Sequence, residues 1–276
     1  MKLQIFAENQ WFVGSDGGKP LMSAVDGRPV ASISSAGVDF AGMLNYARNI
    51  GGPNLRQYTF HDRAFMLKDL AKYLMEQKRE FYELSTDTGA TRSDSWIDID
   101  GGISTLFVYS SKGRREMPND TVYLDGPAET LSREGTFVGQ HICTPRHGAA
   151  VHINAYNFPC WGMLEKLAPC LLAGVPAIVK PASSTAYLTE LMVRRIIDAG
   201  VLPEGAIQLI CGSTGDLFDH LTCQDMVAFT GSKNTAEMLQ QHPRVVSESV
   251  HFTAETDSLN ASILGPDAVP GTPEFD

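Results

Sequence analysis

Short apolar segments alternate with helical segments over the second half of the chain, and this alternation constrains the fold more than any other feature. The apolar segments lie at residues 176–180, 207–211, 226–229 and 245–253. A stretch with helical spacing of apolar residues precedes each of them, and glycines close the helical stretches at 161–172 and 183–197. Strands of this kind are buried on both faces, as in a parallel sheet covered by helices. With right-handed crossovers, the sequence predicts an α/β fold with a doubly wound, Rossmann-like parallel sheet.

The first half of the chain predicts helices and a smaller β segment. Residues 1–60 are irregular and rich in glycine, so we expect only a wrapping segment there. From His61 onward apolar residues recur every three or four positions, which predicts a long helix. A second helix is expected after Ser93, followed by a polar loop over 113–120. Residues 121–153 then change to a strand-like period with glycine-containing turns.

Charge and cysteine usage limit the partners of the chain. With 22 basic and 32 acidic residues the net charge is −10, and the acidic residues are scattered. This balance argues against binding to nucleic acid or to an anionic membrane surface. No apolar run approaches the length of a membrane span, and the first residues contain no signal-peptide core. The five cysteines lack Cys-x-x-Cys spacing, so we expect reduced thiols in a cytoplasmic protein and no metal site.

A lysine and a serine follow the predicted strand at 176–180, in the segment Lys180-Pro-Ala-Ser183. An ammonium group at a strand end can bind ribose hydroxyls or a phosphate as a compact charge. The alternative is a solvated lysine, since lysine is seldom buried without a partner. Ser183 or Ser184 can also cap the helix that follows.

Two glycine turns also follow predicted strands. Phe229-Thr-Gly231-Ser232 enters a helix, where free amides and the serine hydroxyl favour a pyrophosphate; the alternative is a capped helix without a ligand. Gly212-Ser-Thr-Gly215 is a commoner kind of turn. A G-x-G-x-x-G dinucleotide-binding fingerprint follows none of the predicted strands.

Two more polar segments lie at strand ends. Ile153-Asn154-Ala-Tyr-Asn157-Phe-Pro runs from a strand into a helix, and an asparagine amide there can stabilise an oxyanion or simply form an Asx-turn or cap. Glu255 follows the last extended run. Its carboxylate can act as a general base beside a cofactor cleft or can be merely exposed to solvent.

Taken in order, these segments resemble the aldehyde dehydrogenase superfamily. The cofactor-binding half of that family carries an Asn-Phe-Pro segment, a Lys-Pro-Ala segment, a Phe-Thr-Gly-Ser segment and then a glutamate, and all four occur here in that order. The helical stretch 61–91 is similar as well, so the resemblance covers essentially the whole chain. It implies a Rossmann-like domain with N-terminal helices, a β arm at 121–153 used in homo-oligomerisation, a small-molecule aldehyde as substrate, and NAD or NADP as cofactor.

The resemblance also implies a role for each segment. Asn157 would donate to the oxyanion of the thiohemiacetal, and Glu255 would activate the water that releases the acid. Lys180 would hold the adenosine ribose, and Ser232 the pyrophosphate. The remaining expected cofactor contacts are Ile153, Asn154, Ser183, Gly212, Gly215, Phe229 and Gly231.

Ser183 bears on the choice between NAD and NADP. In family members that prefer NAD, the third residue after the lysine is a glutamate that accepts hydrogen bonds from the ribose hydroxyls. A carboxylate there would repel the 2′-phosphate of NADP, and Ser183 removes that repulsion. We therefore expect NADP to bind better than NAD, although the missing repulsion does not by itself exclude NAD.

One departure points to a subgroup of the family. The family glutamate is commonly followed by Leu-Gly-Gly-Lys, whereas Glu255 is followed by Thr-Asp-Ser-Leu-Asn. This segment, together with 88–96 and 157–166, is similar to aldehyde dehydrogenases of aromatic-compound degradation. Some of those are fused to a MaoC-like hydratase (dehydratase) domain, and a related one acts on ring-opened, CoA-linked semialdehydes. The resemblance therefore implies oxidation of a CoA-linked semialdehyde to the acid.

The end of the sequence bears on activity. The family's nucleophilic cysteine lies farther beyond the glutamate than the 276 − 255 = 21 positions that follow Glu255, none of which is cysteine. Thr272-Pro273-Glu274 has the pattern of a helix start. We therefore expect residues 1–260 to form the cofactor-binding domain and 261–276 to begin a truncated catalytic domain, in a chain that is inactive by itself.

Two other classes of function stay open. A catalytically silent nucleotide-binding or assembly module would carry the same cofactor segments. A cysteine-dependent acyl hydrolase would use Cys160, three residues from Asn157, but no His or Lys neighbours this cysteine in sequence to lower the pKa of its thiol. We interpret all five cysteines as structural thiols.

Overall fold

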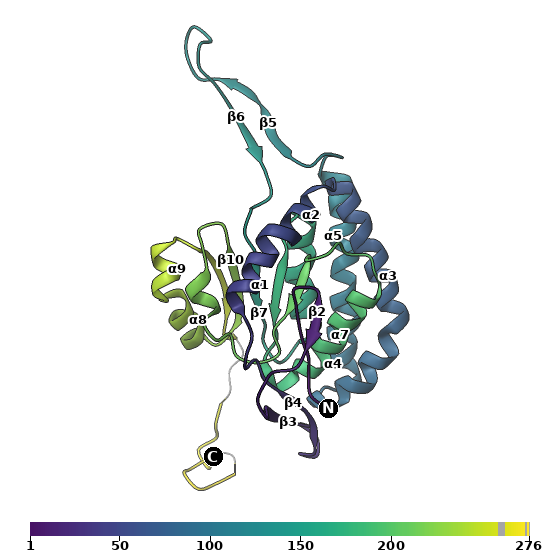
Figure 1. Cartoon of the computed structure of the whole chain (residues 1–276). Helices are drawn as coiled ribbons and strands as arrows, with labels where there is room; N and C mark the ends of the chain where they lie inside the picture. The colour runs from purple at the N-terminus through teal and green to yellow at the C-terminus, as the bar shows by residue number, and fades with distance from the viewer. Residues whose placement is uncertain (259–262, 274, 276) are drawn as a thin grey trace.

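A seven-stranded sheet forms the centre of the computed structural model, which describes residues 1–258, 263–273 and 275 (Figure 1). The strand order is β11-β10-β7-β8-β9-β1-β2. Five of the strands are parallel to one another: β7 (Ala150–Ile153), β8 (Ala177–Lys180), β9 (Ile207–Leu209), β10 (Met226–Gly231) and β11 (His251–Thr256). The predicted α/β fold with a doubly wound, Rossmann-like parallel sheet is confirmed.

The direction of winding reverses between β7 and β10. From β7 the chain adds β8 and then β9 on one side, and it returns to place β10 and then β11 on the other side. In open sheets of this kind ligands bind outside the carboxyl ends of the strands, where the order reverses. The register pairs Ile153 of β7 with Phe229 of β10, so these two strand ends lie side by side at that point.

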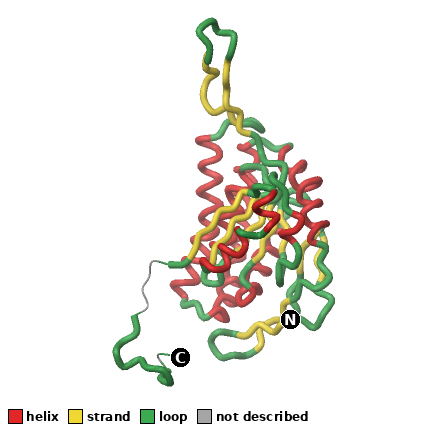
Figure 2. Tube along the Cα trace, turned by 90° about the vertical axis from the view of Figure 1, so that its left-hand side faces the viewer, coloured by secondary structure: helices red, strands yellow, loops and turns green. Residues whose placement is uncertain are grey.

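Helices cover both faces of the sheet (Figures 1 and 2). On one side α6 (Trp161–Leu172) and α7 (Ala186–Asp198) pack against α3 (Phe60–Ser85) and α5 (Gly102–Glu116). On the other side α8 (Lys233–Gln240) contacts β10 and β11, and α9 (Pro243–Ser247) follows it. The apolar residues of β7, β8 and α6 are almost fully buried between these layers, which explains why the strands read as continuous apolar runs.

The long helix predicted from His61 is α3. Thr59 and Asp62 form a capping box at its start, and its apolar residues Leu67, Leu70, Leu74 and Phe81 are fully buried. A short 3₁₀ turn, Thr86–Thr88, follows the helix, and Gly89 then adopts a left-handed conformation with φ 83°. The α3 helix therefore ends at Ser85, just before this turn.

The second predicted helix starts earlier and ends later than expected. It begins as α4 (Arg92–Trp96), because Thr91 and Asp94 form a capping box, and it continues through a π-helical turn into α5, which ends at Glu116. Gly113 was expected to open a loop, yet it lies within α5. A Cβ atom on Gly113 would stand 2.6 Å from Leu172 Cδ1, so this glycine permits close helix packing and is not a helix break.

The first sixty residues form more structure than the expected wrapping segment. Strands β1 (Ile5–Ala7) and β2 (Gln10–Phe12) extend the central sheet in antiparallel fashion beside β9, and β3 (Lys19–Met22) and β4 (Pro29–Ile33) form a separate hairpin. Two short helices follow, α1 (Phe40–Tyr46) and α2 (Gly52–Arg56). The pairing of β1 with β9 joins residues about two hundred positions apart, so the local sequence pattern does not predict it.

The predicted β arm is real but shorter than 121–153. Strands β5 (Tyr123–Thr130) and β6 (Val138–Cys143) form a hairpin that projects from the body of the molecule (Figures 1 and 2). β7 lies instead in the central sheet between β8 and β10, and all four of its residues are buried. Including residues 149–153 in the arm was therefore wrong, because the strand-like period by itself does not distinguish exposed strands from buried ones.

The last segments also differ from expectation. The first three residues of the expected extended run, 245–247, lie instead in α9, which has Pro243 at its first position, and only His251–Thr256 form a strand. The helix start expected at Thr272 is a turn in which the Thr272 amide donates to the Val269 carbonyl over 3.0 Å; Glu274 lies outside the described residues. Within the described part of the chain no helix is long and apolar enough to cross a membrane.

Candidate cofactor cleft and active-site face

A cleft of about 510 Å³ lies at the carboxyl ends of the parallel strands. Four of the predicted cofactor contacts line it, namely Ile153 at the end of β7, Lys180 at the end of β8, Ser183, and Gly212 after β9. One wall comes from Thr235, Met238 and Leu239 of α8. Residues 33–36 of the N-terminal segment form another wall, which the sequence analysis missed entirely. Segments from three strand ends thus converge on one cleft, as the topology requires.

Lys180 is the half-buried cation of this cleft. Burial lowers the pKa of its ammonium group, and within the described residues no carboxylate lies within ion-pair distance of it. A charge held partly out of water without a counter-charge is costly, so an anionic or hydroxyl-rich ligand would stabilise it. Ser183 is the exposed first residue of a 3₁₀ turn and does not cap α7, whose N-cap, Thr185, makes no side-chain capping hydrogen bond.

Asn154, one residue beyond β7, is buried but does not line the cleft. Its backbone amide donates to the Lys180 carbonyl over 3.0 Å, whereas neither atom of its side-chain amide has a hydrogen-bond partner among the residues that the structure describes. An unsatisfied buried amide costs about 1–3 kcal/mol, so such a group usually meets a ligand or an ordered water. A polar ligand at the switch point fits this amide.

The N-terminus of α8 is already satisfied by side chains of the chain itself. Ser232 is the N-cap: its hydroxyl accepts from the Thr235 amide over 3.3 Å and donates to Thr235 Oγ1 over 2.9 Å. Asp257 Oδ1 accepts from the Lys233 amide over 3.0 Å. Ser232 and Gly231 do not line the cleft, and Gly215, after β9, does not line it either. The geometry of the predicted pyrophosphate turn is that of a capped helix.

Glu255 and Phe229 lie in a second hollow, of about 440 Å³. β10 and β11 form one side of this hollow, and Trp161, Glu165 and Lys166 of α6 contribute to the other side. The Glu255 carboxylate is exposed and accepts from Thr230 Oγ1 over 3.4 Å. Glu255 therefore faces the side of the molecule on which α6 begins.

Asn157 lies in the turn between β7 and α6, four residues before Trp161. It is exposed and lines neither of the two hollows. Within the described residues its side-chain amide makes no hydrogen bond, so its donors are free to contact another group. The structure thus places Asn157 and Glu255 on the same edge of the sheet without direct contact.

Asp98 holds the start of α6 and was missed by the sequence analysis. Its carboxylate is buried and accepts from the Cys160 amide over 3.0 Å and from the Trp161 amide over 2.7 Å. Burial raises the pKa of Asp98 to about 6, against the opposing effect of these hydrogen bonds. The signal available in the sequence was the Gly101–Gly102 pair: a Cβ atom on Gly102 would stand 2.9 Å from Trp161 Cα, so the pair brings the two helices together.

The cysteines do not form a nucleophilic site. Cys160 is buried, and burial together with the Asp98 carboxylate raises the pKa of its thiol well above the ordinary value. Burial also raises the pKa of Cys170 to about 12 and that of Cys211. Cys143 and Cys223 are exposed, so our interpretation of all five as structural thiols was wrong for these two. The protonated Cys160 thiol argues against a cysteine-dependent hydrolase.

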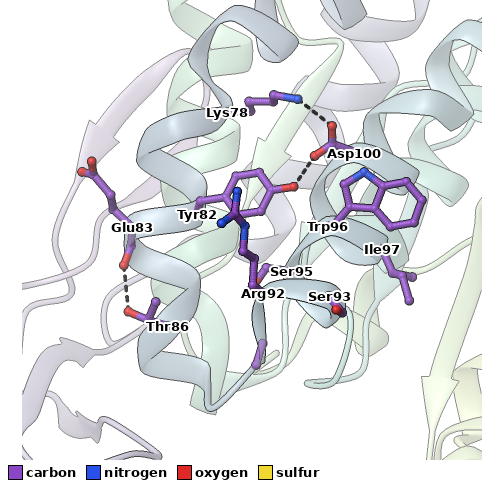
Figure 3. A pocket seen from close by; sticks show the side chains of 11 residues that line it. Lys78, Tyr82, Glu83, Thr86, Arg92, Ser93, Ser95, Trp96, Ile97 and Asp100 are labelled. Carbon is purple, nitrogen blue, oxygen red and sulfur yellow. Dashed lines mark hydrogen bonds and ion pairs between the residues drawn. The ribbon is translucent and has the colours of Figure 1, made fainter.

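A larger hollow lies elsewhere, between the end of α3, α4 and the π-helical turn Ile97–Gly101 (Figure 3). It measures about 990 Å³, and Trp96 and Ile97 are exposed on it. Lys78 and Tyr82 both donate to Asp100, over 2.7 and 2.5 Å. None of the predicted site residues lines this hollow, so size alone does not locate the site. No group of three His, Cys, Asp or Glu side chains in the described chain is placed to hold a metal ion.

Comparison with known proteins identifies relatives over nearly the whole chain. The model of the aldehyde dehydrogenase family matches residues 12–269. The chain is 44% identical over 277 aligned positions to 3,4-dehydroadipyl-CoA semialdehyde dehydrogenase of Aromatoleum evansii, covering 100% of the chain and 54% of that protein. It is 25% identical over 243 positions to succinate-semialdehyde dehydrogenase [NADP(+)] of Escherichia coli (strain K12), covering 86% of the chain and 48% of that protein.

Solved structures share the fold. A point mutant of betaine aldehyde dehydrogenase from Staphylococcus aureus, in complex with NAD+, superposes with a TM-score of 0.77 at 19% identity. The match covers 92% of the chain and 50% of that structure. The chain therefore spans about half the length of the relatives that it matches.

The raised pKa of Asp98 predicts a pH-dependent stability. Because the folded-state pKa of about 6 exceeds the ordinary 3.8, the contribution of Asp98 to stability is fully present below pH 3.8 and is lost as the pH rises through 6. Asp98→Asn removes this titration and keeps an acceptor for the α6 amides. Between pH 4 and 7 we expect the wild type to lose roughly 2 kcal/mol of unfolding free energy relative to Asp98→Asn, measured by urea denaturation.

Asp94→Asn is the matched control for this measurement. Hydrogen bonds from Thr91 lower the pKa of the exposed Asp94, so its contribution is present above pH 3.8 and is lost as the pH falls. The difference in unfolding free energy between Asp94→Asn and the wild type should therefore change with pH in the opposite direction. Parallel stability curves for Asp98→Asn and the wild type would show that the buried carboxylate does not titrate as described.

Proposed function

The chain belongs to the aldehyde dehydrogenase family, and from that premise we propose that it forms the cofactor-binding part of an enzyme that oxidises a CoA-linked semialdehyde to the acid, preferring NADP. The observation that carries the cofactor proposal is the convergence of Ile153, Lys180 and Ser183 on one cleft at the strand ends. The substrate class rests on the 44% identity to the A. evansii enzyme. We place this cofactor-binding domain at residues 1–260 and the start of a catalytic domain at 261–276; that boundary falls within 259–262, outside the described residues.

The residues of the cleft fit a dinucleotide. The half-buried ammonium of Lys180 would bind the adenosine ribose: burial lowers its pKa, and hydrogen bonds from the ammonium to the ribose hydroxyls would offset part of the cost of that burial. Ser183 places a hydroxyl in the cleft where a carboxylate would repel a 2′-phosphate. Asn154 does not line the cleft, but its buried amide, which has no hydrogen-bond partner among the described residues, would offer a donor and an acceptor at the switch point. The cofactor, when bound, would accept a hydride from the substrate.

Asn157 and Glu255 would act on the substrate at the same edge of the sheet. The free amide of Asn157 would donate to the oxyanion that develops on the aldehyde carbon. Its turn leads directly into the α6 amides that Asp98 holds, so its backbone is anchored at one end. The exposed carboxylate of Glu255 would take a proton from the water that releases the acid. Thr230, which donates to Glu255, would orient that carboxylate.

Cofactor titration tests the proposal with the chain as it is. By isothermal calorimetry we expect NADP to bind more tightly than NAD. Ser183→Glu should weaken NADP binding by roughly 10- to 100-fold, because it brings a carboxylate against a phosphate dianion, and should leave NAD binding unchanged or tighter.

Ser184→Glu is the matched control, because it adds the same charge to an exposed neighbour that does not line the cleft. It should leave both affinities nearly unchanged. Equal affinity for the two cofactors, or an equal effect of the two glutamate variants, would contradict the assignment of NADP.

The catalytic roles are testable in a form of the protein that includes the family's thiol-bearing domain. Asn157→Ala should lower the turnover rate about 10²-fold or more, as loss of one oxyanion donor does. Glu255→Gln should preserve the first burst of reduced cofactor in stopped-flow absorbance and slow the steady state, since only acid release needs the base. Glu237→Gln on α8 is the control. If Glu255→Gln lost both the burst and the steady-state rate, Glu255 would only position other groups and would not act as the base.

We also propose that the β5–β6 hairpin mediates homo-oligomerisation. Its exposed apolar residues are Leu124, Leu131, Phe137, Val138 and Ile142. Exposed apolar strands of this kind drive association. Replacing both Phe137 and Val138 with Ser should lower the mass measured by light scattering toward that of a monomer. Val246→Ser, on α9 and equally exposed, should not. A wild-type chain that stays monomeric at high concentration would contradict the proposal.

A further inference from the structure

We propose that Lys19 is a second cation for the 2′-phosphate of NADP and thereby a determinant of cofactor choice. Lys19 is the first residue of β3 and lines the same cleft as Lys180 and Ser183. The inference rests on the proposed cofactor binding and deepens it, because it assigns a recognition role to the β3–β4 hairpin. No sequence motif marks this residue.

The hairpin that carries Lys19 is fixed against the end of β9. Lys19 pairs with Ile33 of β4, and the residues after Ile33 continue along the cleft. Ser35 Oγ donates to the Ser213 carbonyl over 2.9 Å. Gly212 has φ 150°, and a Cβ atom there would stand 2.5 Å from the Ser35 amide nitrogen. The turn after β9 and the N-terminal segment are thus in direct contact, and Lys19 belongs to a wall that is held in place.

The charges in this cleft favour an anion. Three charged side chains line it, Asp16, Lys19 and Lys180, which gives a net charge of +1. The Asp16 carboxylate is engaged in the hairpin: it accepts from the Gly18 amide over 3.0 Å, and a hydrogen bond with Ser34 is the main cause of its lowered pKa. Neither lysine has a carboxylate within ion-pair distance in the part of the chain that the structure describes. Two ammonium groups without an ion-pair partner among the described residues therefore share the cleft with the hydroxyl of Ser183.

This arrangement favours NADP over NAD selectively. A 2′-phosphate is close to dianionic at pH 7 and offers oxygens to more than one cation. Lys180 comes from the end of β8 and Lys19 from the start of β3, so charges from two separate elements would reach the phosphate. NAD carries a hydroxyl there and gives Lys19 no charge to bind. Loss of Lys19 should therefore change the ratio of the two affinities more than it changes the binding of NAD.

The experiment is a set of calorimetric titrations of the 276-residue chain with NADP, NAD and 2′,5′-ADP at fixed ionic strength. Lys19→Ala should weaken NADP and 2′,5′-ADP by about five- to twentyfold, as expected for one partly exposed charge-assisted contact, and change NAD by less than about twofold. Lys19→Arg should retain most of the affinity for NADP. Lys2→Ala is the matched control, since Lys2 is exposed in the same corner of the molecule but does not line the cleft. Equal melting temperatures would show that each variant folds.

Each outcome decides the matter. Equal weakening of NADP and NAD, no weakening of either, or the same effect from Lys2→Ala would overturn the role of Lys19 while leaving cofactor binding intact. A wild-type chain that binds none of the three ligands would overturn the proposed cofactor function, and the role of Lys19 with it. A selective loss confined to the ligands with a 2′-phosphate supports the inference.

Discussion

The parallel pairing of β7 with β10 is the constraint on which the rest of the structure depends. These strands are joined through β8, α7 and β9, so their pairing closes a long loop and fixes where the winding of the sheet reverses. The register of Ile153 opposite Phe229 sets the two strand ends level. Every segment that leaves a parallel strand then starts from one edge. The cofactor cleft, the Asn157 turn and the Glu255 strand end share that edge for this reason.

Two contacts from outside the parallel sheet complete the edge. Asp98 reaches the first amides of α6, and a buried carboxylate is held there despite the cost that its raised pKa records. Ser35 reaches the turn after β9 and holds the N-terminal hairpin against the cleft. The first contact anchors the turn that bears Asn157, and the second brings Lys19 into the cleft. Both tie the site to elements that precede the parallel strands in sequence.

The start of α8 shapes how an anionic cofactor could bind. The Ser232 hydroxyl is used in its own cap, and the Asp257 carboxylate already accepts from the first amide of the helix. A carboxylate at a helix N-terminus stabilises the helix dipole and would repel a pyrophosphate placed there. Asp257 belongs to the segment after Glu255 that departs from the common family pattern. In the proposed complex the principal anion contacts are therefore the side chains of Lys180 and Lys19, more than the helix amides.

The sequence by itself determined the layered α/β architecture, the segments that form parallel strands and the family. Alternation of short buried strands with amphipathic helices is a local pattern, and residues that follow parallel strands must share one edge. That is why Ile153, Lys180, Ser183 and Gly212 could be placed together from the chain alone. The tertiary structure decided the rest, because it depends on contacts between distant residues that leave no local period. Those contacts moved β7 from the arm into the centre, paired β1 with β9, engaged Ser232 in its own cap, and brought Asp98 and Lys19 to the site.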